Sequence, residues 1–212
     1  MKKEQVKPIF ENKFLNVYDL QWKEGMHYYN ASRRKLDDLV AVKKDHDFKE
    51  MIPDAVSCVV ILEYQKKEKL LLDYEFRYPA GQFLLSVPAG LIDPKDQLEK
   101  EPLIATAIRE IKEETGIDVK EQDEIRVINP CLFSTPGMSD ETNGIVLAKI
   151  HLEDLTCLSQ DGAEGTEMFN GFVLLDKQQA KQILLAGRDE KQHFYSVYTW
   201  IALASFVGDL FK

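Results

Sequence analysis

The sequence has 212 residues, of which 44% are hydrophobic, 10% aromatic and 30% charged. This length suits one ordinary domain with some additional chain, and the composition is typical of a globular protein rather than a disordered or collagen-like one. Lysine and arginine number 27 against 36 aspartate and glutamate, which gives a net charge of −9. Such a chain repels nucleic-acid phosphate and anionic lipid, so we expect neither nucleic acid nor a membrane as its partner.

The three cysteines are widely spaced, with no CxxC pair and no histidine at ligand spacing. This pattern does not support a structural zinc site, and Cys58 lies in an apolar run where a thiol usually behaves as a small buried hydrophobe. The lysines near the N-terminus precede polar residues, and no run approaches the roughly 18 apolar residues of a membrane span. We therefore expect a chain that is neither exported nor membrane-spanning, in a reducing cytoplasm.

Residues 1–40 alternate apolar and polar side chains around a Glu24-Gly25 turn, which predicts a β-hairpin or short meander. Residues 45–54 are polar and are expected to form a loop that leads into a buried strand at 56–64. A second strand is predicted at 69–74 and a shorter one at 83–85. These patterns divide the chain into an N-terminal β-element, residues 1–43, and a larger domain, residues 44–212.

The hydrophobic period changes at Pro102, where apolar residues at helical spacing begin. Proline suits the first helical position and Gly116 suits the residue just past the end, so a helix is predicted between them. Further strands are predicted at 125–129, 144–150 and 172–175, and helices at 176–185 and 198–211. Mixed strands flanked by helices predict an α/β or α+β sandwich.

The predicted helix carries three carboxylates on one surface, because Glu110 is four residues before Glu114 and three before Glu113. Like charges at this spacing repel, and the last turn of a helix favours cations. A bound divalent cation would offset both penalties, and Mg²⁺ suits a site of oxygen donors without His or Cys. The alternative is a solvated acidic face of an amphipathic helix.

The run REIKEETGI at residues 109–117, together with Gly90 and an isolated upstream carboxylate, resembles the Nudix box. Its second half matches at every constrained position, whereas the stretch between Gly90 and Arg109 is five residues longer than in the family pattern. Either Glu101 or Asp96 therefore stands for the isolated glutamate, since each keeps one of the two spacings. We favour Glu101, at the helix start, and expect the extra residues to form a passive loop.

Three further segments are similar to motifs of the ADP-ribose pyrophosphatase branch of that family, namely FRYP at 76–79, PAGLID at 88–93 and STPGMSDE at 134–141. The branch often has glutamate two positions before Pro-Ala-Gly, where this chain has Ser86. The resemblance implies a Nudix α/β/α sandwich with a mixed sheet and an N-terminal β-extension. In this branch the extension commonly builds a homodimer.

The resemblance implies a Mg²⁺-dependent hydrolase, with Mn²⁺ as the alternative metal, that cleaves the diphosphate of ADP-ribose or a related nucleotide sugar. It implies Glu110 and Glu114 as metal ligands, with Glu113 as a further ligand or partner and the Ala89 carbonyl completing the site. Arg109, four residues before Glu113, is expected to orient a carboxylate. The branch takes its general base from a downstream loop, where this chain offers Glu164 and Glu167, and we favour Glu167.

Substrate contacts are expected from Arg77, and from Arg33 together with Trp22 and Tyr28, the latter in the pocket of a partner subunit. Aromatic side chains on a strand are more often core or interface, which is the alternative for Trp22 and Tyr28. Two rival functions stay open: a pyrophosphatase acting on UDP- or GDP-sugars, and a Nudix fold that binds a ligand without catalysis. Intact Glu110, Glu113 and Glu114 count against the second, while the longer box and Ser86 count for it.

Overall fold

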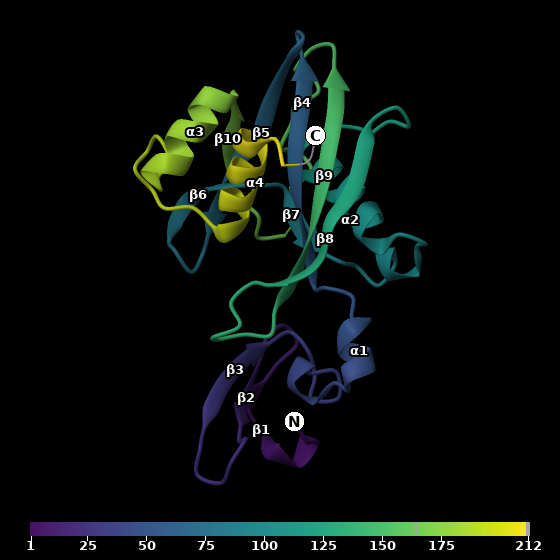
Figure 1. Ribbon diagram of the computed structural model, residues 1–212, viewed down its shortest axis with the longest axis vertical. Helices are drawn as coiled ribbons and strands as arrows, with labels where there is room; N and C mark the ends of the chain where they lie inside the picture. The colour runs from purple at the N-terminus through teal and green to yellow at the C-terminus, as the bar shows by residue number, and fades with distance from the viewer. Residues whose placement is uncertain (164, 211–212) are drawn as a thin grey trace. The chain divides into compact units, whose positions relative to one another are not determined.

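The structure is a computed structural model that describes residues 1–163 and 165–210 (Figure 1). It divides into two compact units, of which the first comprises Met1–Asp54 together with Pro130–Asn143. The second comprises Ala55–Asn129 and Gly144–Lys212. The predicted N-terminal β-element, residues 1–43, falls within the first unit, and its boundary stays a prediction.

The first unit is built on a three-stranded antiparallel sheet with the order β1-β2-β3. Its elements are η1 (Lys3–Gln5), β1 (Val6–Glu11), β2 (Asn16–Leu20), β3 (Tyr28–Ser32), η2 (Val40–Val42) and α1 (Asp45–Lys49). A small core of Val6, Tyr18 and Leu39 holds the sheet against the following segment. The predicted meander is confirmed. The loop predicted at 45–54 is wrong in part, because Asp45 and Lys49 close a helical turn through an i,i+4 ion pair of 2.6 Å.

The second unit carries a seven-stranded sheet with the order β10-β5-β4-β9-β8, in which β6 pairs with β5 and β7 with β4. The strands are β4 (Ala55–Tyr64), β5 (Lys67–Arg77), β6 (Gln82–Ser86), β7 (Ala89–Leu91), β8 (Glu124–Phe133), β9 (Thr142–Leu152) and β10 (Phe169–Leu175). The pairs β4–β5, β5–β6, β5–β10 and β4–β7 are antiparallel. The arrows of β4 and β9 point the same way in Figure 1, so the sheet is mixed, as predicted.

The helical elements of this unit are η3 (Asp96–Leu98), α2 (Pro102–Thr115), α3 (Lys177–Ala186) and α4 (Val197–Gly208). All three predicted helices are confirmed, although residue 211 of the last prediction lies outside the described residues. Within the described part of the chain, no helix has both the length and the apolar character needed to cross a bilayer.

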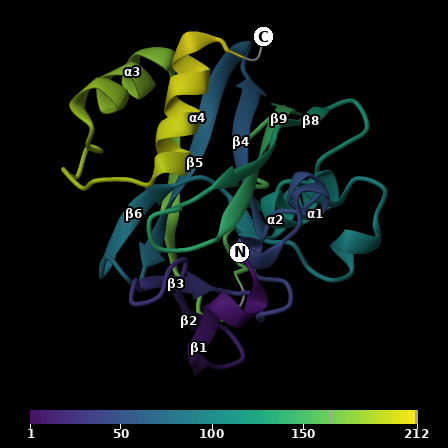
Figure 2. The same cartoon turned by 60° about the horizontal axis from the view of Figure 1, so that its bottom comes forward.

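Strand alternation gives the sheet two covered faces. Val60 of β4 packs in a buried cluster with Ile111 of α2, whereas its neighbour Ile61 lines a hollow with Phe206 of α4. Figures 1 and 2 show α3 and α4 over one face of the sheet and α2 over the other. The second unit is therefore the predicted α/β/α sandwich.

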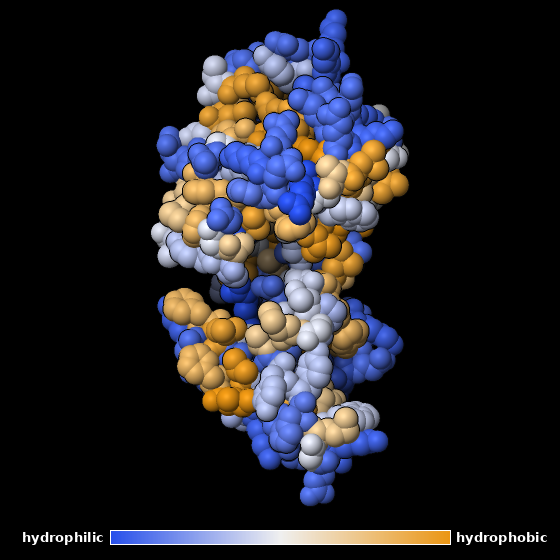
Figure 3. Space-filling model, turned by 90° about the vertical axis from the view of Figure 1, so that its left-hand side faces the viewer, coloured by the Kyte–Doolittle hydropathy of each residue, from blue (hydrophilic) through white to orange (hydrophobic). Residues whose placement is uncertain are grey.

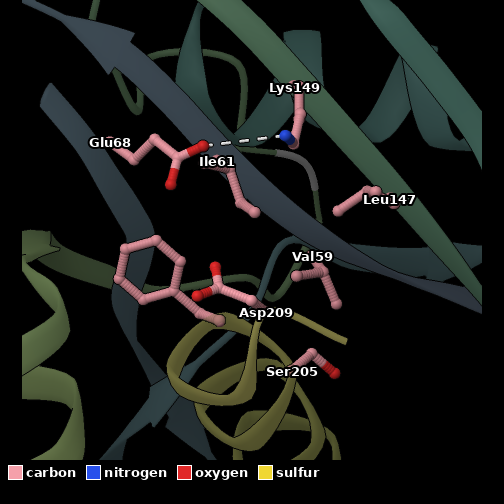
Figure 4. A pocket seen from close by; sticks show the side chains of 8 residues that line it. Val59, Ile61, Glu68, Leu147, Lys149, Ser205 and Asp209 are labelled. Carbon is pink, nitrogen blue, oxygen red and sulfur yellow. Dashed lines mark ion pairs between the residues drawn. The ribbon is translucent and has the colours of Figure 1, made fainter. Parts of the chain in front are cut away.

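The hollow beneath α4 is small. Val59, Ile61 and Leu147 of the sheet lie opposite Ser205 and the segment that follows α4 (Figure 4), and the cavity between them measures about 10 Å³. A cavity of that size holds at most one water molecule. At its rim, Lys149 and Glu68 form an ion pair of 3.6 Å. This part of the α4 face is thus packing that supports the sheet.

The end of α2 is fixed by a glycine that no other residue could replace without strain. Gly116 has a left-handed φ of +76°, and its N–H donates to the Lys112 carbonyl. A Cβ at this position would lie 2.4 Å from the Cys157 carbonyl oxygen. The prediction that the helix ends at Gly116 is confirmed. Because Gly116 has no side chain, the backbone at Cys157 can lie close to the end of the helix.

Candidate functional site

Arg109 of α2 forms ion pairs with three carboxylates. Its guanidinium lies 2.7 Å from Glu110, 2.8 Å from Glu113 and 3.0 Å from Asp96, and it also donates to the Leu91 carbonyl at 2.9 Å. A planar guanidinium with several donors holds such partners in fixed orientations. Arg109 thus contacts Glu113, the carboxylate it is predicted to orient, and the role itself stays a prediction.

Glu110 and Glu114 project from α2 toward the sheet and are 5% and 3% exposed. Burial raises the pKa of Glu110 to about 7, although Arg109 opposes the shift. Burial, and then the charge of Asp73, raise the pKa of Glu114 well above its usual range. One Glu114 oxygen accepts a 3.1 Å hydrogen bond from the Ala89 N–H, so strand β7 and the helix are joined at the predicted site.

Gly90 allows the close approach of β7 to α2. Ala89–Leu91 forms a short strand paired with Ala55–Ser57 of β4. A Cβ on Gly90 would lie 1.8 Å from a Glu110 carboxylate oxygen. The Glu110 carboxylate therefore has room in this position only because residue 90 has no side chain.

Two carboxylates that the sequence reading missed complete the cluster from β5. Asp73 is 1% exposed, and neither of its carboxylate oxygens has a hydrogen-bond partner among the described residues. Glu75 lies two residues on, and burial raises its pKa against the opposing charge of Arg77. The signal was present in the sequence, because an aspartate inside the run LLLDY at 70–74 is a charged residue in an apolar strand.

Glu167 lies between two anchors to the end of β5. The Tyr78 hydroxyl donates to the Thr166 carbonyl at 2.9 Å, and the Phe76 N–H donates to the Met168 carbonyl at 2.8 Å. Burial is the main cause that raises the pKa values of Glu75 and Glu110, and the charge of Glu167 adds to both shifts, while its role as base stays a prediction. Glu164, the other candidate, lies outside the described residues.

The predicted substrate-binding residues are placed as follows. Arg77 forms an ion pair of 2.5 Å with Glu75, so it borders the carboxylate cluster. The other three lie in the first unit, where Arg33 pairs with Glu141 at 3.1 Å, the Tyr28 hydroxyl donates to the Gly137 carbonyl at 2.6 Å, and Trp22 is 66% exposed. Their contact with substrate stays a prediction.

The longer box contributes a residue to the site. Asp96, in η3, is buried and accepts hydrogen bonds from Thr106 at 3.0 Å and from the Arg109 Nε at 3.2 Å. Burial opposes ionisation, but the hydrogen bonds from Arg109 and Thr106 hold the pKa of Asp96 below its usual range. Glu101 is exposed and makes no capping hydrogen bond to α2. Asp96 of the extra segment, and not Glu101, thus contacts Arg109, while the choice between the two as the isolated glutamate stays a prediction.

Replacing Asp96 by alanine should destabilise the chain by about 1–3 kcal/mol, because the substitution removes a buried charged acceptor from Arg109 and Thr106. Glu101→Ala, the matched control, should change the free energy of unfolding by less than about 0.5 kcal/mol. Urea denaturation of both variants measures the difference. Equal effects would show that Asp96 does not secure Arg109.

The cluster suits a divalent cation by its donor set. Among residues 1–163 and 165–210, no three His, Cys, Asp or Glu side chains lie in an arrangement ready to hold a metal ion. However, Glu110, Glu114 and Asp73 are buried oxygen donors, and burial raises the pKa of each carboxyl above its usual range, so that a bound cation would favour their charged forms. Hard oxygen donors of this kind fit Mg²⁺ or Mn²⁺.

The metal-free chain should lose stability relative to Glu114→Gln as the pH rises from about 5 to about 8. The pKa of Glu114 is raised by folding, so the folded chain holds that proton to higher pH than the unfolded chain does. The resulting stabilisation is complete below the unfolded pKa and is lost as the pH rises through the folded pKa. Thermal denaturation in a chelator, followed by circular dichroism, measures Tm for both proteins. A Tm difference that stays constant across this range is the opposing result.

Comparison with known proteins gives the family. Residues 51–160 match the NUDIX domain. Nudix hydrolase 14 of Arabidopsis thaliana is 30% identical over 117 residues, which cover 52% of this chain and 37% of the relative. ADP-sugar pyrophosphatase of Mus musculus is 33% identical over 102 residues, covering 48% and 43%. ADP-ribose pyrophosphatase of Bacillus subtilis is 28% identical over 154 residues, covering 72% and 65%.

The match thus spans between about a third and two thirds of the length of these relatives. The NUDIX match includes α2, β7 and η3, so the residues around Arg109 lie inside the matched domain. The family match covers more than half of the sequence, from residue 51 to residue 160 of 212. The chain belongs to the Nudix family.

Proposed function

We propose that this chain hydrolyses the diphosphate bond of ADP-ribose or a related nucleoside diphosphate sugar, releasing a nucleoside monophosphate and a sugar phosphate. One observation carries the proposal: Glu110 and Glu114 are buried side by side on α2, under β7, with Glu113 held beside them by Arg109. Relatives named ADP-sugar pyrophosphatase and ADP-ribose pyrophosphatase support the substrate class.

In this proposal Glu110, Glu114 and the Ala89 carbonyl hold Mg²⁺, or Mn²⁺, with Glu113 as a further ligand or partner. When bound, the cation would neutralise negative charge on the phosphate oxygens and so favour attack of water on phosphorus and departure of the leaving phosphate. Arg109 keeps Glu110 and Glu113 oriented, at 2.7 and 2.8 Å. Glu167, fixed beside the buried carboxylates by its neighbours, takes the proton of the attacking water as general base.

Arg77 binds a phosphate or ribose oxygen in this scheme, since its guanidinium borders the cluster through Glu75. Arg33, Trp22 and Tyr28 are proposed to bind the base and ribose from a partner subunit. The first unit exposes many large apolar and aromatic side chains, namely Ile9, Phe10, Phe14, Leu15, Trp22, Met26, Tyr28 and Tyr29. Figure 3 shows patches of orange and pale orange on one face of the molecule. So much exposed apolar surface on a small unit is typical of an interface, and we propose a homodimer.

The double variant Phe10→Ser/Met26→Ser should convert the dimer to monomer, because both side chains are more than half exposed and their loss leaves the fold intact. Leu185→Ser, at an exposed position of the second unit, is the matched control and should stay dimeric. Sedimentation velocity at micromolar concentration measures the mass of each. A wild-type chain that sediments as a monomer would remove the dimer from the proposal.

The proposed location is a reducing compartment such as the cytoplasm. Cys58, Cys131 and Cys157 form no disulfide within the described residues. The net charge of −9 gives no support to nucleic acid or an anionic membrane as a partner.

Two rivals are separated by one panel of assays. The purified chain with Mg²⁺ is incubated with ADP-ribose, ADP-glucose, UDP-glucose and GDP-mannose, and the products are resolved by ion-exchange chromatography. AMP and ribose 5-phosphate formed fastest from ADP-ribose support the proposal. Faster release of UMP or GMP would assign the chain to UDP- or GDP-sugars, and binding of any of these without products would make it a ligand-binding module.

A further inference from the structure

Asp73 is a buried charge that the family motifs do not explain. It follows three leucines of β5 that are fully buried, its side chain is 1% exposed, and its two carboxylate oxygens have no hydrogen-bond partner among the described residues. Nearly all buried polar groups in folded proteins are satisfied, and an isolated buried carboxylate is strongly destabilising. In its charged form, a carboxylate in this position would need a cation to compensate it.

The direction of the side chain follows from strand alternation. Leu71 packs in the buried cluster that contains Ala107 and Ile111 of α2. Asp73, two residues further along β5, points from the same face of the sheet toward the same helix. Glu114 is one turn beyond Ile111 on the buried side of α2, and the charge of Asp73 acts on it directly. The Asp73 carboxylate thus faces the carboxylate cluster.

The register of the sheet places Asp73 opposite Ser86. The two residues are direct partners in the antiparallel pair β5–β6. Ser86 is buried, and its hydroxyl donates to the Leu84 carbonyl at 3.3 Å, so it does not pair with Asp73. Directly opposed residues have Cβ atoms about 4.5–5.5 Å apart on one face, so a carboxylate on either strand can serve nearly the same point in space.

We propose that Asp73 supplies, from β5, the carboxylate that the related branch often carries at the position of Ser86, and that it belongs to the cation site of Glu110 and Glu114. The inference rests on the proposed function, because it assumes that a divalent cation binds at α2. Position 73 on β5 and position 86 on β6 are opposed in the register, so they present their side chains on the same face of the sheet. The rival explanation is a neutral carboxyl that is tolerated in the core and has no part in cation binding.

The test measures binding of Mn²⁺ alone, without nucleotide, by isothermal titration calorimetry and by the rise in Tm that the ion produces. Asp73→Asn removes the charge at nearly constant volume and should weaken the affinity about 10–100-fold, the range typical for residues that support a metal site. Asp189→Asn is the matched control. It is also a buried carboxylate, and after burial itself its charge is the next cause that raises the pKa of Tyr74, a residue on the opposite face of β5. Asp189→Asn should leave the affinity unchanged.

A transposed variant keeps the test decisive if Asp73→Asn folds poorly. In Asp73→Ser/Ser86→Glu the carboxylate moves across the pair, and the Mn²⁺ affinity should return to within about threefold of the wild type. Equal Mn²⁺ affinity in the wild type and Asp73→Asn would overturn the inference and leave the proposed function standing. Absence of Mn²⁺ binding to the wild-type chain would instead contradict the proposed function itself.

Discussion

Glu114→Gln should leave the chain folded and lower kcat by about 100-fold or more. Mutating residues that only support metal ligands already costs about 10–100-fold, and Glu114 is proposed to be a ligand itself. The substitution is nearly isosteric, and an amide oxygen can still accept the hydrogen bond that the Ala89 N–H donates at 3.1 Å. What is lost is the negative charge of a side chain that is 3% exposed. In the proposed reaction that charge holds the cation, so the loss falls on the chemical step.

The measurement compares kcat and KM for ADP-ribose in saturating Mg²⁺, with far-UV circular dichroism to show that the variant is folded. Glu101→Gln is the matched control, because Glu101 is an exposed carboxylate at the start of the same helix. It should retain wild-type kcat. Wild-type turnover by Glu114→Gln would remove Glu114 from the metal site.

Gly90→Ala should lower activity by a similar factor for a different reason. The added Cβ would lie 1.8 Å from a Glu110 carboxylate oxygen, far inside van der Waals contact. Glu110 cannot turn away freely, because it is buried and lies 2.7 Å from the Arg109 guanidinium. The carboxylate must therefore shift, and a displacement of about 1 Å at a reacting site can cost about 100-fold in rate. The accompanying loss of stability should be about 1–3 kcal/mol, as for other overpacked sites.

Gly137→Ala is the control for that experiment. A Cβ at Gly137 meets nothing within 4 Å, and the residue does not have a left-handed φ, so the substitution should be neutral. Both variants are compared by kcat/KM and by urea denaturation. If Gly90→Ala retained wild-type activity, the close approach of β7 to Glu110 would not be a requirement of the site.

The sequence was sufficient to predict a helix where a clear helical period of apolar residues ends at a clear termination signal. Helix α2 begins at Pro102 and is followed by Gly116, as predicted, because proline fits the first turn and a left-handed residue must end the helix. The long strands β4 and β9 were also predicted, since both are almost continuously apolar and buried between two layers of helices. By contrast, α1 was missed because its five residues bury nothing and carry no hydrophobic period.

Other parts of the site depend on tertiary contacts and could not be predicted from the sequence. Asp96 and Glu101 were equivalent by spacing, and only the fold of η3 brings Asp96 to Arg109. Asp73 could have been noticed as a charge in an apolar strand, but its position opposite Ser86 depends on the length of the β5–β6 connection, which sets the register. The role of Gly90 likewise depends on the distance between β7 and α2, which no local pattern encodes.

The most direct test of the proposed function is turnover measured together with binding. The wild-type chain and Glu114→Gln are each incubated overnight with ADP-ribose and Mg²⁺, and AMP and ribose 5-phosphate are quantified beside the calorimetric affinity for ADP-ribose. The proposed function predicts complete hydrolysis by the wild type, and binding without comparable turnover by Glu114→Gln. Tight Mg²⁺-dependent binding of ADP-ribose by the wild type with no product formed would contradict it, and would show a Nudix chain that binds its ligand without cleaving it.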